Sequence, residues 1–253
     1  MKLLRAYVWL LAALLYTPIG AMVVLSFNDS RLPYVWGGFT LKWYESLFKW
    51  EAAWSALFNS LIVALAVAAV SVGLGVFMAF VLKSDRFLVL SQGAVVMPEV
   101  TEALAFAAAL LLIKTYAGVD LFGPAGVFLA HLAYAIPMAH VLLTPYVGYV
   151  KTSVLEASRI LGASELRSVL TVAVPILAPA LVAAFLIVFA NSFDTYIKTA
   201  FTTSPGFTTA PLLLWAFAAR GRGDPTIYAL ATLMLIPSII AAVIYFRAVK
   251  KFE

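Results

Sequence analysis

Residues 156–179, EASRILGASELRSVLTVAVPILAP, form the longest polar interruption between two very apolar segments of this sequence. Gly162 separates two short helical patterns, and Pro175 and Pro179 follow where the chain becomes apolar again. A chain this apolar has little reason to keep an ordered amphipathic insert unless another molecule docks on it. We therefore expect a docking surface in this stretch.

The composition identifies the class of protein. Of the 253 residues, 64% are hydrophobic and 11% are charged, with a mean hydropathy of +1.02, whereas soluble domains have about 45–50% apolar and about 25% charged residues. The sequence therefore predicts an all-α, polytopic membrane protein and excludes a soluble enzyme. It contains no cysteine, which excludes disulfides, a thiol nucleophile and a cysteine-ligated metal. Lys and Arg retained in cytoplasmic loops explain the net charge of +5 better than nucleic-acid binding does.

A transmembrane helix needs about 20 mostly apolar residues, and six stretches of the chain meet this requirement. We expect one transmembrane domain, 1–253. The first stretch is interpreted as an uncleaved span, because it is longer than the apolar part of a signal peptide and lacks a clear cleavage site. The expected spans are 6–27, 56–82, 92–115, 125–147, 176–200 and 226–246.

The distribution of Lys and Arg predicts the orientation. With the N-terminus in the cytoplasm, ten of these residues fall in cytoplasmic segments and five in outer loops. The positive-inside rule therefore favours both termini in the cytoplasm, together with the loop 148–175. In the outer loops, 40–48 is expected to form an amphipathic surface helix with Thr40 as its N-cap, and 211–219 is apolar but too short to span.

The cytoplasmic loop contains two amphipathic pieces, 153–161 and 164–173. Ser153 and Ser164 are expected N-caps, and Gly162 is expected to end the first piece, so that the two form a helix–turn–helix elbow. On spacing alone, an ordinary surface loop is an equally good interpretation. The apolar face that a partner's groove would receive consists of Leu155, Ile160, Leu161, Leu166, Val169 and Leu170.

Four ionisable residues fall within expected spans: Glu99, Glu102, Asp194 and Lys198. A charge at this depth costs at least about 2.5–3.5 kcal/mol and usually faces protein or water. Glu99 and Glu102 share one helix face after Pro98. They either line a path for a cationic solute or complement the dipole of a helix that begins at Pro98. The sequence leaves both interpretations open.

Asp194 and Lys198 are four residues apart, and we expect them to form an ion pair on one helix face. This pair either holds the bundle together or contacts solute. Asn191 and Tyr196 add polar groups nearby.

Sequence motifs for chemistry are absent: there is no GxxxxGK[ST], HExxH or GxSxG. We therefore expect no catalytic residue, no metal and no cofactor, and no ATP binding by a Walker motif. His131 and His140 lie on nearly opposite faces of one helix, so we expect them to pack or hydrogen-bond rather than share a metal. Gly73 and Gly75 are typical of close helix packing in lipid.

The cytoplasmic loop resembles the signature loop of binding-protein-dependent ABC importer permeases, which reads EAA, three further residues, Gly and later an apolar-Pro pair. This chain reads Glu156-Ala157-Ser158, then Gly162-Ala163, then Val174-Pro175, with Ser158 replacing the third Ala. Other segments resemble the spermidine/putrescine-type permeases: SFNDSR at 26–31, GGFTLKWYESLF at 37–48 and FANSFDTYIKTAFTTSP at 189–205.

The resemblance implies a permease subunit in the cell membrane that hydrolyses no ATP itself. Its implied partners are two copies of an ATP-binding subunit, a second permease subunit and an extracytoplasmic solute-binding protein, within the lipid bilayer and without nucleic acid. The implied solute is a polyamine or another small cation. The alternative is a secondary transporter or an intramembrane enzyme acting without an ATPase, although only one span looks broken and no nucleophile–base set is visible.

Two sets of residues follow from this resemblance. The expected ATPase-coupling residues are Glu156, Ala157, Ser158, Arg159, Gly162, Ala163 and Pro175, in and after a coupling helix that begins at Glu156. The candidate solute-path residues are Glu99, Glu102, Asn191, Asp194 and Lys198, of which Asp194 matches an acidic position of the subfamily.

Overall fold

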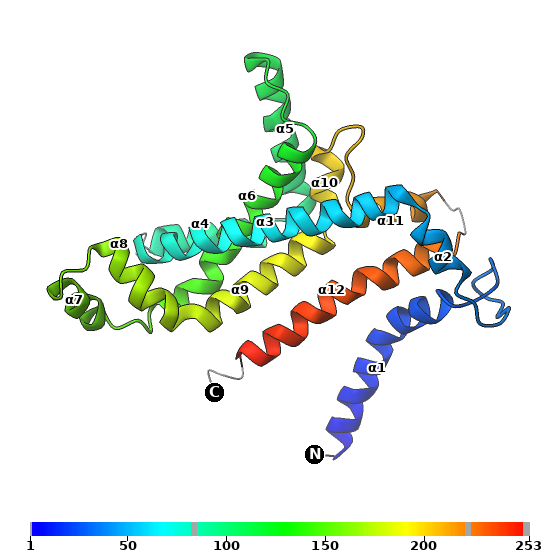
Figure 1. The fold of residues 1–253 in the computed structure, drawn as a ribbon, viewed down its shortest axis with the longest axis horizontal. Coiled ribbons are helices and arrows are strands. Elements are labelled where there is room, and N and C mark those ends of the chain that lie inside the picture. Colours follow the sequence, from blue (N-terminus) through cyan, green and yellow to red (C-terminus); the bar gives the residue numbers. More distant parts are fainter. Residues whose placement is uncertain (1, 82–84, 221–223, 250–253) are drawn as a thin grey trace.

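The structure, a computed structural model, describes residues 2–81, 85–220 and 224–249. Within these ranges the chain is helical, and its one β contact is an isolated antiparallel bridge between Asn28 and Phe39 (Figure 1). The all-α prediction is confirmed. The helices are α1 (Lys2–Leu25), α2 (Lys42–Phe48), α3 (Glu51–Val81), α4 (Asp85–Val96), α5 (Glu99–Ala117), α6 (Pro124–Val147), α7 (Thr152–Ile160), α8 (Glu165–Ser168), the π-helix η1 (Val169–Ala173), α9 (Val174–Asp194), α10 (Ile197–Thr202), α11 (Ala210–Ala219) and α12 (Thr226–Val249).

Six helical segments are long and apolar enough to cross a membrane. The predicted spans 6–27, 125–147 and 226–246 correspond to α1, α6 and α12. The predicted span 56–82 begins earlier, at Glu51. The six segments are Tyr7–Leu25, Glu51–Val81, Glu99–Ala117, Pro124–Val147, Glu165–Asp194 and Thr226–Arg247.

The third predicted span, 92–115, is not one helix. It divides into α4 and α5 at Met97 and Pro98, and Pro98 has an extended backbone with φ −57° and ψ 130°. Proline has no N–H to continue the hydrogen-bond ladder, and it disfavours helical geometry at the residue before it. Pro98 therefore starts a new helix, and Glu99 and Glu102 both lie in the first turn of α5.

The fifth predicted span, 176–200, is wrong at both ends. The helix already begins at Glu165 and ends at Asp194, and Thr195 is extended before α10 starts. Near its start, η1 is a π-helix in which the Val174 N–H donates to the Val169 carbonyl, five residues back. The next residue, Pro175, cannot donate to the carbonyl four residues earlier and would clash with it in a regular α-helix. The wider π turn accommodates this proline.

The two short helices predicted in the outer loops are both present. The helix predicted at 40–48 is α2, but Leu41 rather than Thr40 precedes it, and the Thr40 hydroxyl accepts a hydrogen bond from the Lys42 N–H at 3.2 Å. The apolar segment predicted at 211–219 is α11. Figure 1 shows α2 at one end of the long axis and α7 with α8 at the other.

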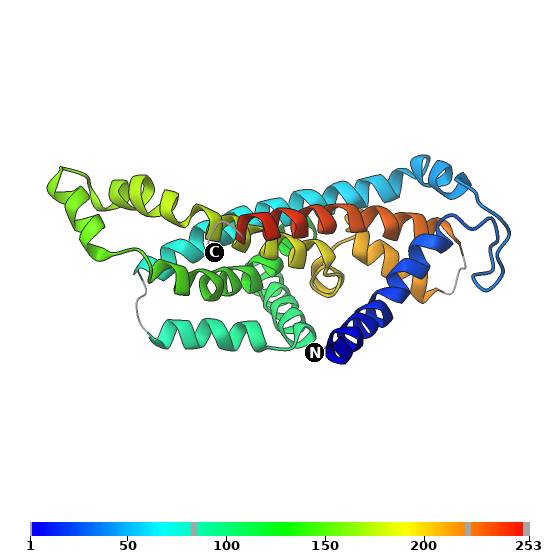
Figure 2. The ribbon, with the colours of Figure 1, turned by 90° about the horizontal axis from the view of Figure 1, so that it is seen from below.

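The core of the bundle lies where α3 packs against α6 and α9, and α12 packs on α9. A Cβ added at Gly75 would lie 2.7 Å from the Ala139 Cβ, so glycine lets α3 approach α6 closely. The same added atom at Gly73 meets nothing within 4 Å, so Gly73 is not a site of close packing between helices of this chain. Helix α1 stands apart from this core and contacts α12 (Figure 2).

Candidate functional site

The elbow between α7 and α8 is a Schellman turn. The Gly162 N–H donates to the Arg159 carbonyl at 2.9 Å, and the Ala163 N–H donates to the Ser158 carbonyl at 3.1 Å. Gly162 has φ +91°, a left-handed conformation that glycine adopts without strain. Gly162 therefore ends α7 as the sequence predicts, and the chain reverses direction within a few residues.

Side chains on both arms hold the elbow in one shape. The Ser158 and Ser168 hydroxyls are hydrogen-bonded at 2.6 Å, and Arg159 donates to Glu165 at 2.7 Å. The Ser164 hydroxyl accepts a hydrogen bond from the Arg167 N–H, so its predicted capping role is confirmed. Ser153 lies inside α7 rather than at its N-cap, which is Lys151, so that prediction is wrong.

The apolar face predicted for the elbow divides in two. Leu155 and Val169 pack against Val150, Ala173 and Leu177, in a cluster that also receives side chains from the ends of α3 and α6. The other four, Ile160, Leu161, Leu166 and Leu170, are exposed, the first two at 86% and 88%. The elbow is thus anchored to three long helices on one side and presents bare apolar side chains on the other.

The residues expected to couple to an ATPase lie mostly on the exposed side. Glu156, Ala157, Arg159 and Gly162 are exposed, and no residue of α7 is buried. Ser158 and Ala163 are half-buried in the elbow, and Pro175 lies in the first turn of α9 beyond η1. These positions suit a docking surface with a rigid internal frame.

A second polar site lies where α9 ends, and its pairing differs from the predicted one. The Lys198 ammonium is 3.0 Å from Glu99 Oε1 and 3.9 Å from Glu102 Oε2. Asp194 instead accepts a hydrogen bond from Ser238 of α12 at 3.4 Å. The Asp194–Lys198 ion pair is wrong because it assumes a continuous helix, whereas the extended Thr195 separates the two residues.

Lys198 is enclosed by these partners. Its side chain is 3% exposed, and its ammonium lies 4.4 Å from the centroid of the Tyr134 ring. Such cation–π contact is attractive, most of all away from water. Glu99 is more open, at 39% exposure, and its Oε1 also accepts a hydrogen bond from the Thr195 hydroxyl.

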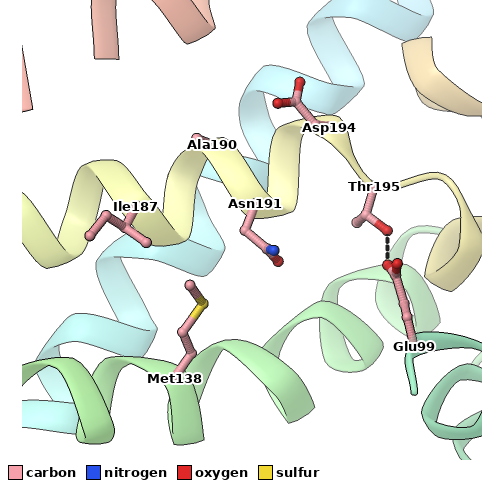
Figure 3. Close-up of a pocket in the computed structure, with 7 residues that line it drawn as sticks. All are labelled: Glu99, Met138, Ile187, Ala190, Asn191, Asp194 and Thr195. Carbon is pink, nitrogen blue, oxygen red and sulfur yellow. Dashed lines mark hydrogen bonds between the residues drawn. The ribbon is translucent and has the colours of Figure 1, made fainter. Parts of the chain in front are cut away.

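A pocket of about 430 Å³ opens beside this cluster (Figure 3). Its polar lining comes from Glu99, Asn191, Asp194 and Thr195. Figure 3 shows the Asn191 and Asp194 side chains leaving α9 on different sides, with Glu99 reaching toward Thr195. The structure therefore joins Glu99, Glu102 and Lys198 in one cluster and leaves Asp194 at the border of the pocket. The apolar lining consists of Met138, Ile187 and Ala190.

His131 bridges the break between α9 and α10. Its buried ring lies 2.8 Å from the Ser192 hydroxyl and 3.3 Å from the Thr199 hydroxyl, one on each side of the break. His140 is hydrogen-bonded to Ser91 of α4 at 2.8 Å, so the predicted hydrogen-bonding role of both histidines is confirmed. No group of three or more potential metal-binding side chains comes together in the described parts of the chain.

Sequence reasoning missed Tyr134, Met138 and Thr195 as members of this site. Residues 131, 134 and 138 are spaced at i, i+3 and i+7, the pattern of one helix face. That spacing could have identified the face of α6 that meets α9 and α10. Nothing in the local sequence marks Thr195 as a break. Tyr196, also predicted near the site, stacks on Trp215 of α11, with their ring centroids 5.5 Å apart.

Comparison with protein families gives one match over most of the chain. Residues 71–252 match the family model described as "Binding-protein-dependent transport system inner membrane component". This range includes the elbow, the pocket and the Lys198 cluster.

Curated relatives resemble the chain over nearly its whole length. The putrescine transport system permease protein PotI of Escherichia coli (strain K12) is 31% identical over 87% of this chain and 81% of its own length. The spermidine/putrescine transport system permease protein PotC of the same strain is 29% identical over 96% of this chain and 92% of its own length.

Solved structures support the fold alone, because their sequences are distant. One similar chain comes from a bacterial alginate ABC transporter in complex with an alginate pentasaccharide-bound periplasmic protein. It has a TM-score of 0.71 and 12% sequence identity, and the match covers 98% of this chain and 91% of that chain. The MetNI methionine ABC transporter in inward-facing conformations is similar at TM-score 0.57 and 15% identity, covering 80% of this chain and 99% of its own.

Proposed function

The chain belongs to the family of binding-protein-dependent transport system inner membrane components. From this premise we propose which residues couple it to an ATPase and which residues line its solute path. It is the permease subunit of an ABC importer, a multi-pass membrane protein with polyamine permeases among its relatives. The alternative of a secondary transporter or an intramembrane enzyme is set aside by the family.

The elbow is the ATPase-coupling site of this proposal. Helix α7, from Glu156 onward, docks in the cleft of a separate ATP-binding subunit, of which the complex has two copies. The observation that carries the proposal is the elbow's two-sided construction: Ile160 and Leu161 are bare, while Leu155 is anchored to the ends of three long helices. A partner that moves α7 therefore moves the spans with it.

We treat the permease as a protein with two arrangements of its spans, and ATP binding to the partner shifts the balance between them. ATP binding closes the partner's cleft around α7, and the ATP-bound partner binds one arrangement of the spans better than the other. The difference in affinity shifts the permease toward an outward-open path, into which an extracytoplasmic binding protein releases its solute. For this arrangement, both termini and the loop 148–175 lie in the cytoplasm, as the Lys and Arg distribution favours.

The pocket beside α9 is the solute path of this proposal. Glu99, Asn191 and Asp194 are polar side chains within apolar spans, and Asn191 and Asp194 are exposed on α9. Carboxylates at membrane depth face protein or water rather than lipid. A second permease subunit therefore covers this face and completes a water-filled path between the two chains.

The acidic character of the path favours a cationic solute. Glu99 and Asp194 are the carboxylates that line the pocket, and opposite charge in a site of low dielectric gives strong attraction. Putrescine and spermidine, named for the relatives, are cations of the right kind. We propose a polyamine or another small cation as the solute.

The coupling role is tested with Glu156→Lys in the purified complex with its ATPase. Association of the ATPase and solute uptake should both fall, because the charge of an exposed docking residue is reversed. Glu45→Lys is the matched control, since Glu45 is also exposed but lies on α2 at the opposite end of the molecule. Unchanged association and uptake in Glu156→Lys would disprove the coupling role.

The path is tested separately with the double variant Glu99→Gln and Asp194→Asn, which keeps shape and removes charge. Uptake of 1,4-diaminobutane should fall strongly, while ATPase association stays as in the wild type. If diamine uptake is untouched, the cationic path is refuted and the coupling proposal stands.

A further inference from the structure

Lys198 is a buried cation in direct contact with the acidic side of the pocket. It lies on α10, whereas the carboxylates it contacts lie on α5 and the Tyr134 ring lies on α6. Its ammonium reaches Glu99 at 3.0 Å while the Lys198 side chain stays 3% exposed. A lysine enclosed to this degree depends on its counter-charge, since an unpaired buried ion is strongly unfavourable.

Glu99 faces in two directions at once. Its carboxylate accepts from Lys198 on the enclosed side and lines the pocket on the open side. At 39% exposure it is reachable from the pocket, whereas Lys198 is not among the lining residues. A solute ammonium entering the pocket therefore meets a carboxylate that an internal ammonium already holds.

We propose that Lys198 is a tethered cation that competes with the ammonium of a solute for Glu99. This inference rests on the proposed cationic path and adds the residue that sets its affinity. Lys198 binds Glu99 when the pocket holds no cation, and a cationic solute displaces it.

Glu102 is a second carboxylate that the displaced Lys198 can bind. Its Oε2 lies 3.9 Å from the Lys198 ammonium and is buried without a hydrogen-bond partner among the described residues. A small movement of the Lys198 side chain from Glu99 toward Glu102 keeps its charge paired. After the exchange the solute ammonium pairs with Glu99 and Lys198 pairs with Glu102 alone, so no buried charge is left uncompensated.

The tether multiplies the intrinsic affinity for solute by the fraction of time that Glu99 is free. If this fraction is about one tenth, removing the Lys198 charge tightens binding about tenfold. A lysine with a purely structural role predicts the opposite, since its loss would disorder Glu99 and weaken binding.

The absence of cysteine in this chain allows the charge to be removed and restored at one position. Lys198→Cys is assembled with cysteine-free partner subunits in lipid nanodiscs, without the binding protein. Affinity for labelled 1,4-diaminobutane is measured before and after reaction with methyl methanethiosulfonate, which adds a neutral group, or 2-aminoethyl methanethiosulfonate, which adds an ammonium. Lys114→Cys is the control, because Lys114 pairs with Asp120 at 2.6 Å in an exposed position outside the pocket.

The expected result is about tenfold tighter diamine binding in Lys198→Cys and its neutral adduct, with near wild-type affinity after the ammonium is restored. The same reagents should leave the Lys114→Cys affinity unchanged. If Lys198→Cys does not assemble, the comparison is made between Glu102→Gln and Glu102→Gln with Lys198→Cys, where removing the lysine should again tighten binding.

Equal or weaker binding without the Lys198 charge overturns the tether. When the wild-type affinity still depends on Glu99, shown with Glu99→Gln, only the tether has failed. When the wild-type complex binds no diamine, or binds it without dependence on Glu99, the proposed cationic path has failed and the tether fails with it.

Discussion

Replacing Gly162 by alanine tests whether the shape of the elbow, rather than its composition, carries the coupling. Gly162 has φ +91°, and a Cβ added there meets nothing within 4 Å. The substitution therefore causes no clash with another part of the structure. Its cost is the conformational cost of an L-residue in the left-handed region, about 1–2 kcal/mol.

This cost falls on the turn that joins the two arms of the elbow. The backbone hydrogen bonds of Gly162 and Ala163 and the hydrogen bond between Ser158 and Ser168 favour the observed shape, and alanine at position 162 disfavours it. A shift of 1–2 kcal/mol changes the ratio of two conformations by a factor of about 5–30. We expect Gly162→Ala to lower the solute transported per ATP hydrolysed by a factor in the lower part of this range.

Gly118 provides the matched control. It also ends a helix, with φ +70°, and an added Cβ there also meets nothing within 4 Å. Gly118→Ala should have a similar conformational cost, but at the end of α5 and away from the elbow. Solute uptake and ATP hydrolysis are measured together in vesicles with the complete importer. Gly162→Asn is a rescue variant, because asparagine tolerates the left-handed region.

The result that refutes this reasoning is specific. If Gly162→Ala and Gly118→Ala give the wild-type ratio of solute to ATP, the elbow's shape does not matter for coupling. If both lower the ratio equally, the loss comes from general destabilisation. The reasoning holds only if Gly162→Ala alone lowers the ratio and Gly162→Asn restores most of it.

Two further predictions concern stability and charge. Gly75→Ala should destabilise the bundle by about 1–3 kcal/mol, because the new Cβ would lie 2.7 Å from the Ala139 Cβ; Gly73→Ala, which meets nothing, should be neutral or slightly stabilising, and equal thermal unfolding of the two would contradict the predicted clash. The hydrogen bond from Lys114 holds the pKa of Asp120 below its usual range. The lowered pKa means that the pair contributes stability above the ordinary aspartate pKa and loses it as the pH falls through the lowered value. Carboxyl NMR of Asp120 should therefore show a low titration midpoint that moves up in Lys114→Met, and an unmoved midpoint would exclude Lys114 as the cause.

The parts of the fold that sequence predicted well are those with local causes. The length of α6 follows from its own run of apolar residues, and the end of α7 follows from Gly162 and its neighbours. Pro98 likewise signals a possible break, although the predicted span 92–115 ran through it. Such features do not depend on contacts with distant parts of the chain, so they can be predicted from the local sequence.

The parts that sequence could not predict depend on distant contacts. The break after Asp194 has no glycine or proline, and it is held by His131 bonding to both sides of it and by Lys198 reaching α5. The rule that pairs residues four apart presupposes an unbroken helix. The ion pair between Asp194 and Lys198 followed from that assumption and was wrong for the same reason. Which carboxylate Lys198 binds is decided by α5, about a hundred residues earlier in the numbering.

The π-helix η1 has a consequence for exchanging parts between importers. Each residue of an α-helix adds about 1.5 Å of length and about 100° of rotation. Deleting one residue from Val169–Ala173 would turn the elbow by about that angle relative to α9, and would separate Leu155 from the cluster that anchors it. A loop transplanted from another permease should therefore be exchanged together with its helix as far as Pro175, so that the elbow keeps its orientation relative to α9.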